Sequence, residues 1–102
     1  MEEVRPMRLR WTPRARSVID AIHDYISKHN PRAATALIDR IRQSAALLAN
    51  YPRMGRETDI ASVQVLPVVR YPYLLYHRVD DDELVIVHVR YGARDAPQPG
   101  AL

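Results

Sequence analysis

The sequence feature that most constrains the fold is a pair of amphipathic helical segments that follow each other almost without a linker. Thr12-Pro13 and Asn30-Pro31 each place a capping side chain directly before a proline, which favours the first turn of a helix. Apolar residues then recur at three- and four-residue spacing to about Lys28 in the first segment and about Asn50 in the second. Two helices with so short a connection are expected to pack as an antiparallel hairpin.

The apolar faces of this hairpin need a third surface to cover, and the rest of the chain predicts a sheet that supplies it. Residues 7–11 alternate apolar and basic side chains, as a half-buried strand does. After the proline- and glycine-containing segment 51–56, three runs have the character of strands: 63–69, 73–79 and 84–91. The predicted order is β-α-α-β-β-β, an α+β fold with the helix hairpin packed on one face of a small, largely antiparallel sheet.

Length and composition indicate a single domain. We expect residues 1–6 to be a flexible lead, residues 7–95 to form the domain, and the proline-containing residues 96–102 to be a loose tail, in a chain of 102 residues. The chain has no cysteine, which excludes disulfides and thiolate metal sites, and no apolar run is long enough to span a bilayer. These features predict a cytoplasmic protein without a membrane partner.

The basic residues are almost all arginine. The formal net charge is +3, and Lys28 is the single lysine among 15 basic residues. Because the guanidinium group binds carboxylates and phosphates with two parallel hydrogen bonds, this bias suggests an acidic partner. High genomic GC content, which favours arginine codons, would produce the same bias, so charge alone does not decide between these explanations.

Four consecutive acids, residues 80–83, separate the last two predicted strands. We expect them to form a hairpin loop rather than a metal site. His23 and His29 are not at the four-residue spacing of helical metal ligands, and with His77 and His88 they form no recognised metal set. No glycine-rich phosphate loop is present either. The sequence therefore predicts no metal and no cofactor.

The acidic loop also predicts the two faces of the sheet, if it pairs Val79 with Leu84. Cross-strand partners share a face, and a slip of one residue would exchange the two sets. The face expected to meet the helices carries Leu74, Tyr76, Arg78, Val85, Val87, Val89 and Tyr91. The face expected to be free for a partner or ligand carries Tyr73, Leu75, His77, Ile86, His88 and Arg90.

The order of these segments resembles that of a known family. A strand, a helix hairpin whose second helix starts at Asn30-Pro31, "YPRMGR", "VLPVVRYPYLLYHRV", an acidic turn and "LVIVHVRYGARD" together are similar to the RelE/ParE superfamily of toxins from type II toxin–antitoxin operons. The resemblance covers about Met7 to Asp95. It implies a compact βααβββ fold and a cognate antitoxin, whose acidic amphipathic C-terminal segment wraps the toxin and which alone connects the complex to operator DNA.

The superfamily divides by target. RelE-like members cleave mRNA on the ribosome, whereas ParE-like members act on DNA gyrase and lack the ribonuclease residues. The "P.MGR" loop and "RYPYLLYHRV" strand look more like the ParE branch, although Gln64 and Tyr91 stand where many relatives have arginine and histidine. We therefore predict a toxin that inhibits gyrase by binding, and is not itself an enzyme. A metal-independent endoribonuclease and a non-toxic homologue that acts only in an antitoxin or repressor complex remain the alternatives.

Candidate target-binding residues gather where the last strand ends. Arg90, Tyr91 and Arg94 are predicted to contact gyrase. The ribonuclease alternative uses the same stretch: His77 or His88 would supply acid–base chemistry, Arg90 and Arg94 would bind phosphate, and Tyr91 would stack on a base or donate a proton.

The antitoxin is expected to bind beside the helix hairpin. Apolar grooves there would hold its amphipathic segment, and Arg16, Arg40 and Arg42 are predicted to be the charges at the rim.

Overall fold

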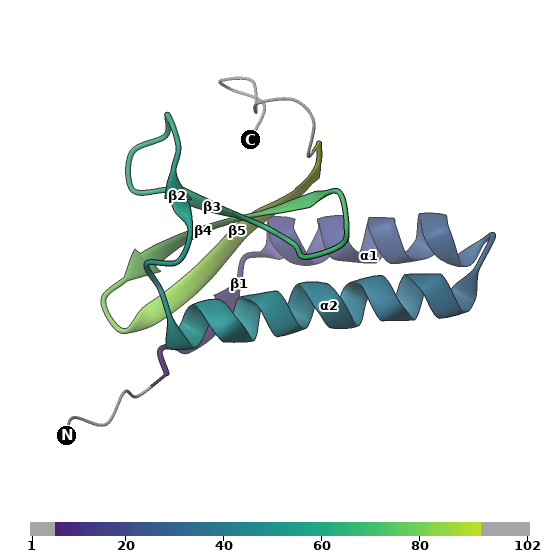
Figure 1. The fold of residues 1–102 in the computed structure, drawn as a ribbon, viewed down its shortest axis with the longest axis horizontal. Coiled ribbons are helices and arrows are strands. Elements are labelled where there is room, and N and C mark those ends of the chain that lie inside the picture. The colour runs from purple at the N-terminus through teal and green to yellow at the C-terminus, as the bar shows by residue number, and fades with distance from the viewer. Residues whose placement is uncertain (1–5, 93–102) are drawn as a thin grey trace.

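The computed structural model describes residues 6–92, which form two helices packed on a five-stranded sheet (Figure 1). The elements, in chain order, are β1 (Arg8–Trp11), α1 (Pro13–Ser27), α2 (Pro31–Asn50), β2 (Arg56–Glu57), β3 (Gln64–Pro67), β4 (Tyr73–Asp80) and β5 (Glu83–Tyr91). Arg94, the predicted tail 96–102 and nearly all of the predicted lead 1–6 lie outside the described residues.

Both predicted helix starts are confirmed. The Thr12 hydroxyl accepts a hydrogen bond from the Ala15 amide at 3.1 Å, and the Asn30 side chain accepts one from the Ala33 amide at 3.1 Å. In each helix a proline occupies the first turn, where a missing N–H costs nothing. Neither helix contains a stretch long and apolar enough to cross a bilayer.

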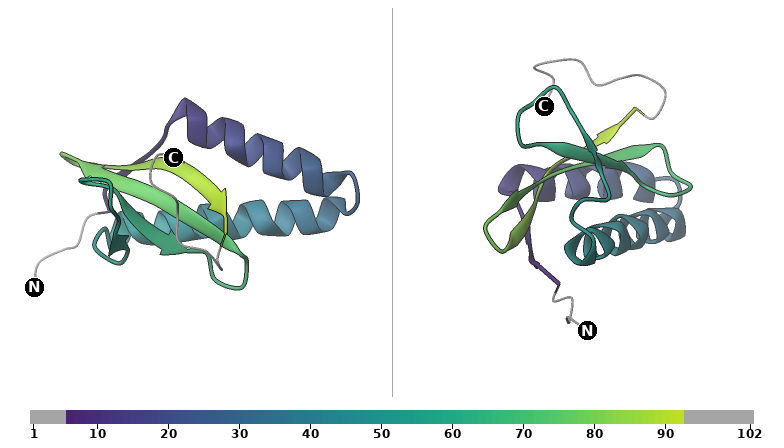
Figure 2. Two further views of the ribbon diagram at one scale, coloured as in Figure 1. Left: turned by 90° about the horizontal axis from the view of Figure 1, so that it is seen from above. Right: turned by 60° about the vertical axis from the view of Figure 1, so that its left-hand side comes forward.

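The α+β prediction is confirmed, with one strand more than expected. The strand order is β1-β5-β4-β3-β2, with β1 parallel to β5 and the other neighbours antiparallel. The two-residue β2 was not predicted, because so short a strand has no periodicity to detect. Both helices cover one face of the sheet, and their connected ends project beyond the strands (Figures 1 and 2).

The main core lies between the hairpin and the sheet. Its buried residues are Ala15, Ile19, Leu37, Ile38, Ile41, Ala45, Leu48, Ala49, Val68, Leu75, Leu84, Ile86 and Val89. A smaller buried cluster, Val65, Leu74 and Tyr76 with Val63 and Val87 beside it, lies on the opposite side of the sheet. We call this side, which is turned away from the helices, the outer face.

A bulge in β5 changes the predicted faces. Val79 pairs with Leu84 as expected, but the register shifts between His77, which pairs with Ile86, and Tyr76, which pairs with His88. Val87 is left as the extra residue, and an extra residue inverts the alternation on one side of a bulge.

The two faces were exchanged in the prediction for β4 and for the part of β5 before the bulge, because the wrong face was chosen to meet the helices. Four residues predicted to be free share the face that meets the helices: Tyr73, Leu75, His77 and Ile86. Five predicted to meet the helices belong to the outer face: Leu74, Tyr76, Arg78, Val85 and Val87. His88 and Arg90 do lie on the outer face, as predicted, because they follow the bulge.

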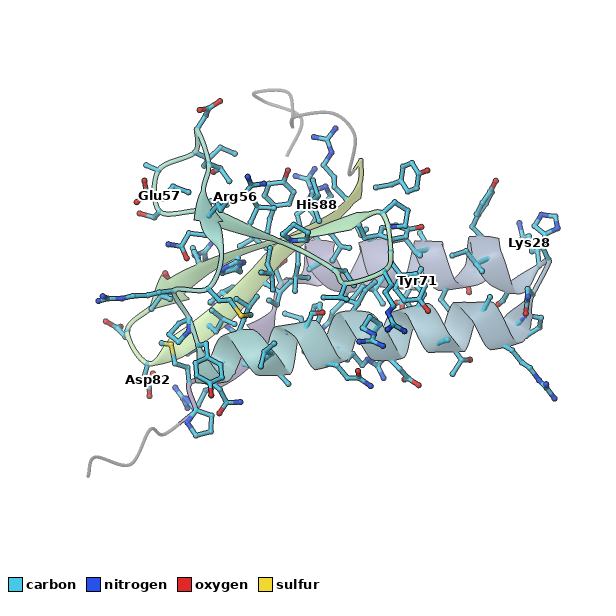
Figure 3. All side chains as sticks on the ribbon, in the orientation of Figure 1. Lys28, Arg56, Glu57, Tyr71, Asp82 and His88 are labelled. Atoms are coloured by element: carbon cyan, nitrogen blue, oxygen red, sulfur yellow. The ribbon has the colours of Figure 1, made fainter. Side chains whose placement is uncertain are left out.

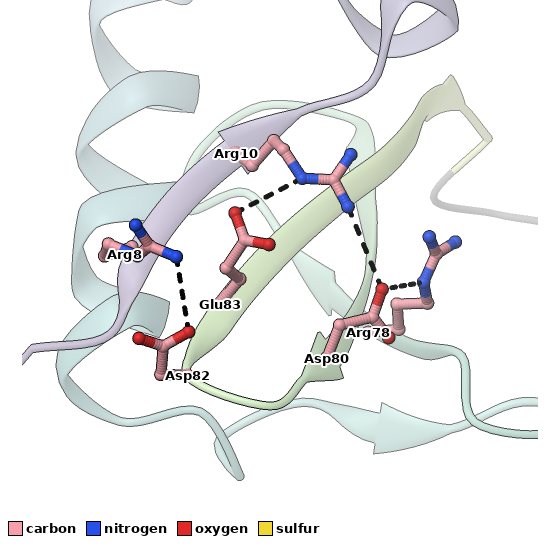
Figure 4. Close-up of polar contacts among 6 residues, drawn as sticks. All are labelled: Arg8, Arg10, Arg78, Asp80, Asp82 and Glu83. Carbon is pink, nitrogen blue, oxygen red and sulfur yellow. Dashed lines mark hydrogen bonds and ion pairs between the residues drawn. The ribbon is translucent and has the colours of Figure 1, made fainter.

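The acidic turn between β4 and β5 forms the predicted hairpin loop, and three of its four acids are paired with arginines. Arg8 lies 3.5 Å from Asp82, and Arg10 lies 3.3 Å from Glu83 and 3.8 Å from Asp80 (Figure 4). The Arg78 Nε atom donates to Asp80 at 3.0 Å. The pairs of Arg8 and Arg10 link the edge strand β1 to the turn. All of these ion pairs are at least partly exposed to solvent, so each contributes little to stability alone.

Candidate binding surfaces

The predicted target-binding residues of β5 point to opposite faces of the sheet. Tyr91 is 70% exposed and packs edge-on against Tyr73, with ring centroids 5.5 Å apart. Arg90, one residue earlier, is half-buried and lies on the outer face opposite Leu74. The structure therefore does not bring Arg90 and Tyr91 together on one surface, and Arg94 lies outside the described residues.

Tyr91 belongs to an exposed aromatic surface that sequence reasoning missed. Burial raises the pKa of the Tyr73 hydroxyl, and the nearby Tyr91 and Tyr25 hydroxyls raise it further. Tyr25 comes from α1, is 70% exposed and contacts the His29 ring edge-on. We call Tyr25, Tyr73 and Tyr91 the tyrosine cluster. A signal for it existed, because Tyr25 stands three residues after Ile22 and helical spacing puts it beside the apolar stripe.

His77 is buried beneath the segment that follows α2. The ring is 0% exposed, and its Nδ1 atom donates to the Leu75 carbonyl oxygen at 3.1 Å. Burial lowers the pKa of His77, an effect that this hydrogen bond partly opposes. The neutral ring is therefore the stable form. His77 and His88 lie on opposite faces of the sheet, so they cannot serve one acid–base site.

His88 is part of a polar cluster on the outer face. It is 9% exposed and lies beside the fully buried Tyr76, with ring centroids 6.3 Å apart, on the side of the sheet away from the helices (Figure 3). Burial lowers the pKa of His88, and the positive charges of Arg14 and Arg90 lower it further. Burial raises the pKa of Tyr76, and Arg90 opposes this.

Two of the three predicted antitoxin-binding arginines line one pocket. Arg16 of α1 and Arg42 of α2 surround a depression of about 230 Å³ together with Trp11, Ile19 and Asp20. Arg40 does not line it, although it lies only two residues from Arg42 in the same helix. The pocket combines two apolar side chains with two guanidinium groups and one carboxylate. Within residues 6–92, no three histidine, aspartate or glutamate side chains converge as a metal site would require.

Comparison with known sequences gives consistent matches over most of the chain. A family model described as the ParE toxin of the type II toxin–antitoxin system parDE matches residues 9–96. The chain is 36% identical over 91 residues to Y4kP of Sinorhizobium fredii, covering 89% of this chain and 94% of the relative. It is 39% identical over 84 residues to the toxin RelE2 of Caulobacter vibrioides, covering 82% and 93%.

Solved structures agree with the sequence matches. A chain from the chromosomal ParDE system of P. aeruginosa superposes with a TM-score of 0.76 at 27% identity, over 84% of this chain and 96% of that one. A chain from the RelBE2 toxin–antitoxin complex of Mycobacterium tuberculosis, at 23% identity, shares the fold with a TM-score of 0.58 over 91% and 99%. The chain therefore belongs to the ParE toxin family of type II toxin–antitoxin systems, within the RelE/ParE superfamily.

Proposed function

We propose that this toxin acts by binding DNA gyrase rather than by chemistry of its own, and that a cognate antitoxin silences it. The observation that carries the choice of binding over catalysis is the position of the histidines. His77 is fully buried on the face of the sheet that meets the helices, and His88 lies on the outer face. Gyrase is the target implied by the resemblance to the ParE branch.

The tyrosine cluster is the surface proposed to contact gyrase. Tyr91 offers a large, rigid ring at the end of β5, and aromatic side chains of this kind supply much of the binding energy at protein interfaces. We propose that Arg90 and the later residue Arg94 contribute positive charge. Arg90 lies on the outer face, so gyrase or its bound DNA would have to contact both faces of the sheet at the end of β5.

The pocket between the helices is proposed to receive the antitoxin. Arg16 and Arg42 would pair with carboxylates, while Trp11 and Ile19 would accept apolar side chains of an amphipathic segment. Arg40 would act at the periphery. The solved relatives in P. aeruginosa and M. tuberculosis are toxin–antitoxin systems, which supports an antitoxin partner here. The complex would reach operator DNA only through the antitoxin.

A supercoiling assay with purified gyrase and the purified chain tests this proposal. We expect inhibition of supercoiling or accumulation of linear plasmid. Replacing Tyr91 with alanine should weaken inhibition about thirtyfold, as for a central interface aromatic. Tyr51→Ala is the matched control, because Tyr51 is 60% exposed and lies just after α2, outside the tyrosine cluster. Equal effects of the two substitutions would contradict the proposed surface.

The ribonuclease alternative is supported by the 39% identity to a protein named RelE2. It is tested by inducing the chain alone in bacteria and following ribosome-bound mRNA and plasmid supercoiling in the same culture. Cleaved mRNA with normal supercoiling would establish the ribonuclease and overturn the gyrase proposal. No change in either would indicate a non-toxic homologue. Altered supercoiling with intact mRNA is the result that we expect.

A further inference from the structure

Unpaired buried polar atoms are concentrated on the outer face of the sheet. Four buried side-chain nitrogen or oxygen atoms within residues 6–92 have no hydrogen-bond partner. One is the Nε2 atom of His77, and the other three are Tyr76 Oη, His88 Nδ1 and Arg90 Nη1. A folded protein rarely leaves such atoms unpaired, so a water molecule, an ion or a ligand is expected to complete their hydrogen bonding. Three of the four lie within one cluster.

The pairing of the strands brings these three groups together. Tyr76 and His88 are direct cross-strand partners, and Arg90 follows His88 on the same face of β5. Arg90 is close enough to influence the pKa of both Tyr76 and His88. Tyr76 is fully buried and His88 is 91% buried, so neither side chain is free to turn toward water.

Within residues 6–92, the charge around this cluster is positive and no acidic side chain pairs with it. Arg14, which is exposed, and Arg90 both lower the pKa of His88, and within residues 6–92 neither arginine forms an ion pair. The arginines of the acidic turn differ in this respect, because Arg8, Arg10 and Arg78 are all paired. An anion bound beside these two guanidinium groups would be stabilised by both positive charges.

The start of α1 adds a further source of positive potential. The Thr12 hydroxyl donates to the Val87 carbonyl oxygen at 3.3 Å, which ties the first turn of the helix to the bulge beside His88. Helix starts favour negative charge, yet the first turn of α1 holds no acidic residue and carries Arg14 instead. The backbone dipole and the arginines therefore act in the same direction.

We propose that Arg14, Tyr76, His88 and Arg90, at the bulge of β5, form a binding site for a phosphodiester group of a nucleic acid strand. Two guanidinium groups, a phenol and an imidazole together offer donors from several directions, which suits the tetrahedral phosphate better than the planar carboxylate. The exposed Arg14 and the half-buried Arg90 would make first contact. Tyr76 and His88 would add hydrogen bonds from the buried side of the site.

This site goes beyond the proposed function, because it does not depend on which target the toxin has. For a gyrase toxin the strand would be DNA, held together with the enzyme. For a ribonuclease it would be RNA. The two sources share the same phosphodiester chemistry, and the choice between them is open to direct measurement.

The test uses fluorescence anisotropy of the purified chain with labelled DNA and RNA oligonucleotides of the same sequence. We expect Arg90→Gln to weaken binding at least tenfold, the effect of a lost hydrogen bond to a charged group. We expect Arg14→Gln to act in the same direction. Arg32→Gln is the matched control, since it removes the same charge from an exposed arginine at the start of α2, away from the bulge. Similar losses for Arg32→Gln and Arg90→Gln would overturn the site.

Tyr76→Phe separates a ligand-binding role from a structural one. Phenylalanine keeps the buried ring and removes only the unpaired hydroxyl, so the variant should be at least as stable as the parent in urea. A several-fold loss of oligonucleotide affinity without loss of stability is expected. Unchanged affinity would remove Tyr76 from the site and overturn its proposed composition.

Two further outcomes distinguish the inference from the proposed function. Gyrase inhibition by a chain that binds neither oligonucleotide would overturn the phosphodiester site and leave the proposed function standing. Binding of an acidic peptide, lost in Arg90→Gln, with no binding of either oligonucleotide would reassign the cluster to a carboxylate ligand. Oligonucleotide binding without gyrase inhibition would support the site and contradict the proposed function.

Discussion

Replacing Gly55 with alanine tests how His77 is held in the interior. A Cβ atom at position 55 would lie 2.6 Å from Cε1 and 2.8 Å from Nε2 of His77, and 3.0 Å from the Val65 carbonyl oxygen. The imidazole cannot move away easily, because it is fully buried and its Nδ1 atom is bonded to the Leu75 carbonyl. Glycine is required here by this close approach rather than by an unusual backbone angle.

The expected cost follows from two opposing effects. Inserting a methyl group into a well-packed interior destabilises by about 1–3 kcal/mol. Replacing glycine stabilises by about 0.4–1 kcal/mol, because the unfolded chain loses freedom. The first effect is the larger, so the free energy of unfolding should fall by about 1–2 kcal/mol. For a domain of this size, each kcal/mol lowers the Tm by about 4–8 °C.

The assay is urea unfolding followed by the fluorescence of Trp11, the single tryptophan, which packs against the main core. The cycle comprises the parent, Gly55→Ala, His77→Ala and the double variant. If the clash with the ring is the main cause, Gly55→Ala should cost much less once His77 is alanine, because only the approach to the Val65 carbonyl oxygen then remains. A Gly55→Ala protein as stable as the parent, or an equal cost in both backgrounds, would refute this account of the packing.

Three further predictions concern stability. Burial lowers the folded pKa of His77 and His88, so the stability that they contribute is complete above about pH 6.5 and is lost as the pH falls through the folded pKa values. Urea unfolding should show this loss as the pH falls below about 6.5, with a shallower slope in His77→Ala; a flat profile in the parent would contradict it. Thr12→Ala removes a helix cap and the bond to Val87, and should lower the unfolding free energy by about 0.5–2 kcal/mol. Arg10→Met breaks two partly exposed ion pairs and should cost at most about 1 kcal/mol, a difference that shrinks in high salt.

The elements that could be predicted from the sequence are those with local signals. The caps at Thr12 and Asn30 act within a few residues of the chain, so both helices and their hairpin followed directly. The faces of the sheet could not be predicted in the same way. Both parities of β4 and β5 carry apolar residues, and both faces are partly buried, so alternation does not tell which one meets the helices. The bulge at Val87 lacks a glycine that would mark it.

The candidate surfaces could be predicted only where they depend on local signals in the sequence. Arg16 and Arg42 share a pocket because the hairpin, which the caps determine, sets the two helices side by side. The pairing of Tyr76 with His88 depends instead on a register set by the bulge. The lack of hydrogen-bond partners for their polar atoms is a property of the packed structure, which no sequence pattern reveals.

Positive charge on the outer face is distributed unevenly between the two ends of the sheet. At the turn, three acids pair with Arg8, Arg10 and Arg78, so this end of the sheet is close to neutral. At the bulge, Arg14 and Arg90 have no such partners within residues 6–92. Exposed ion pairs contribute little to stability, but they do set the local field. A nucleic acid strand would therefore be attracted to the bulge end of the sheet rather than to the turn, and this preference should weaken as the ionic strength rises.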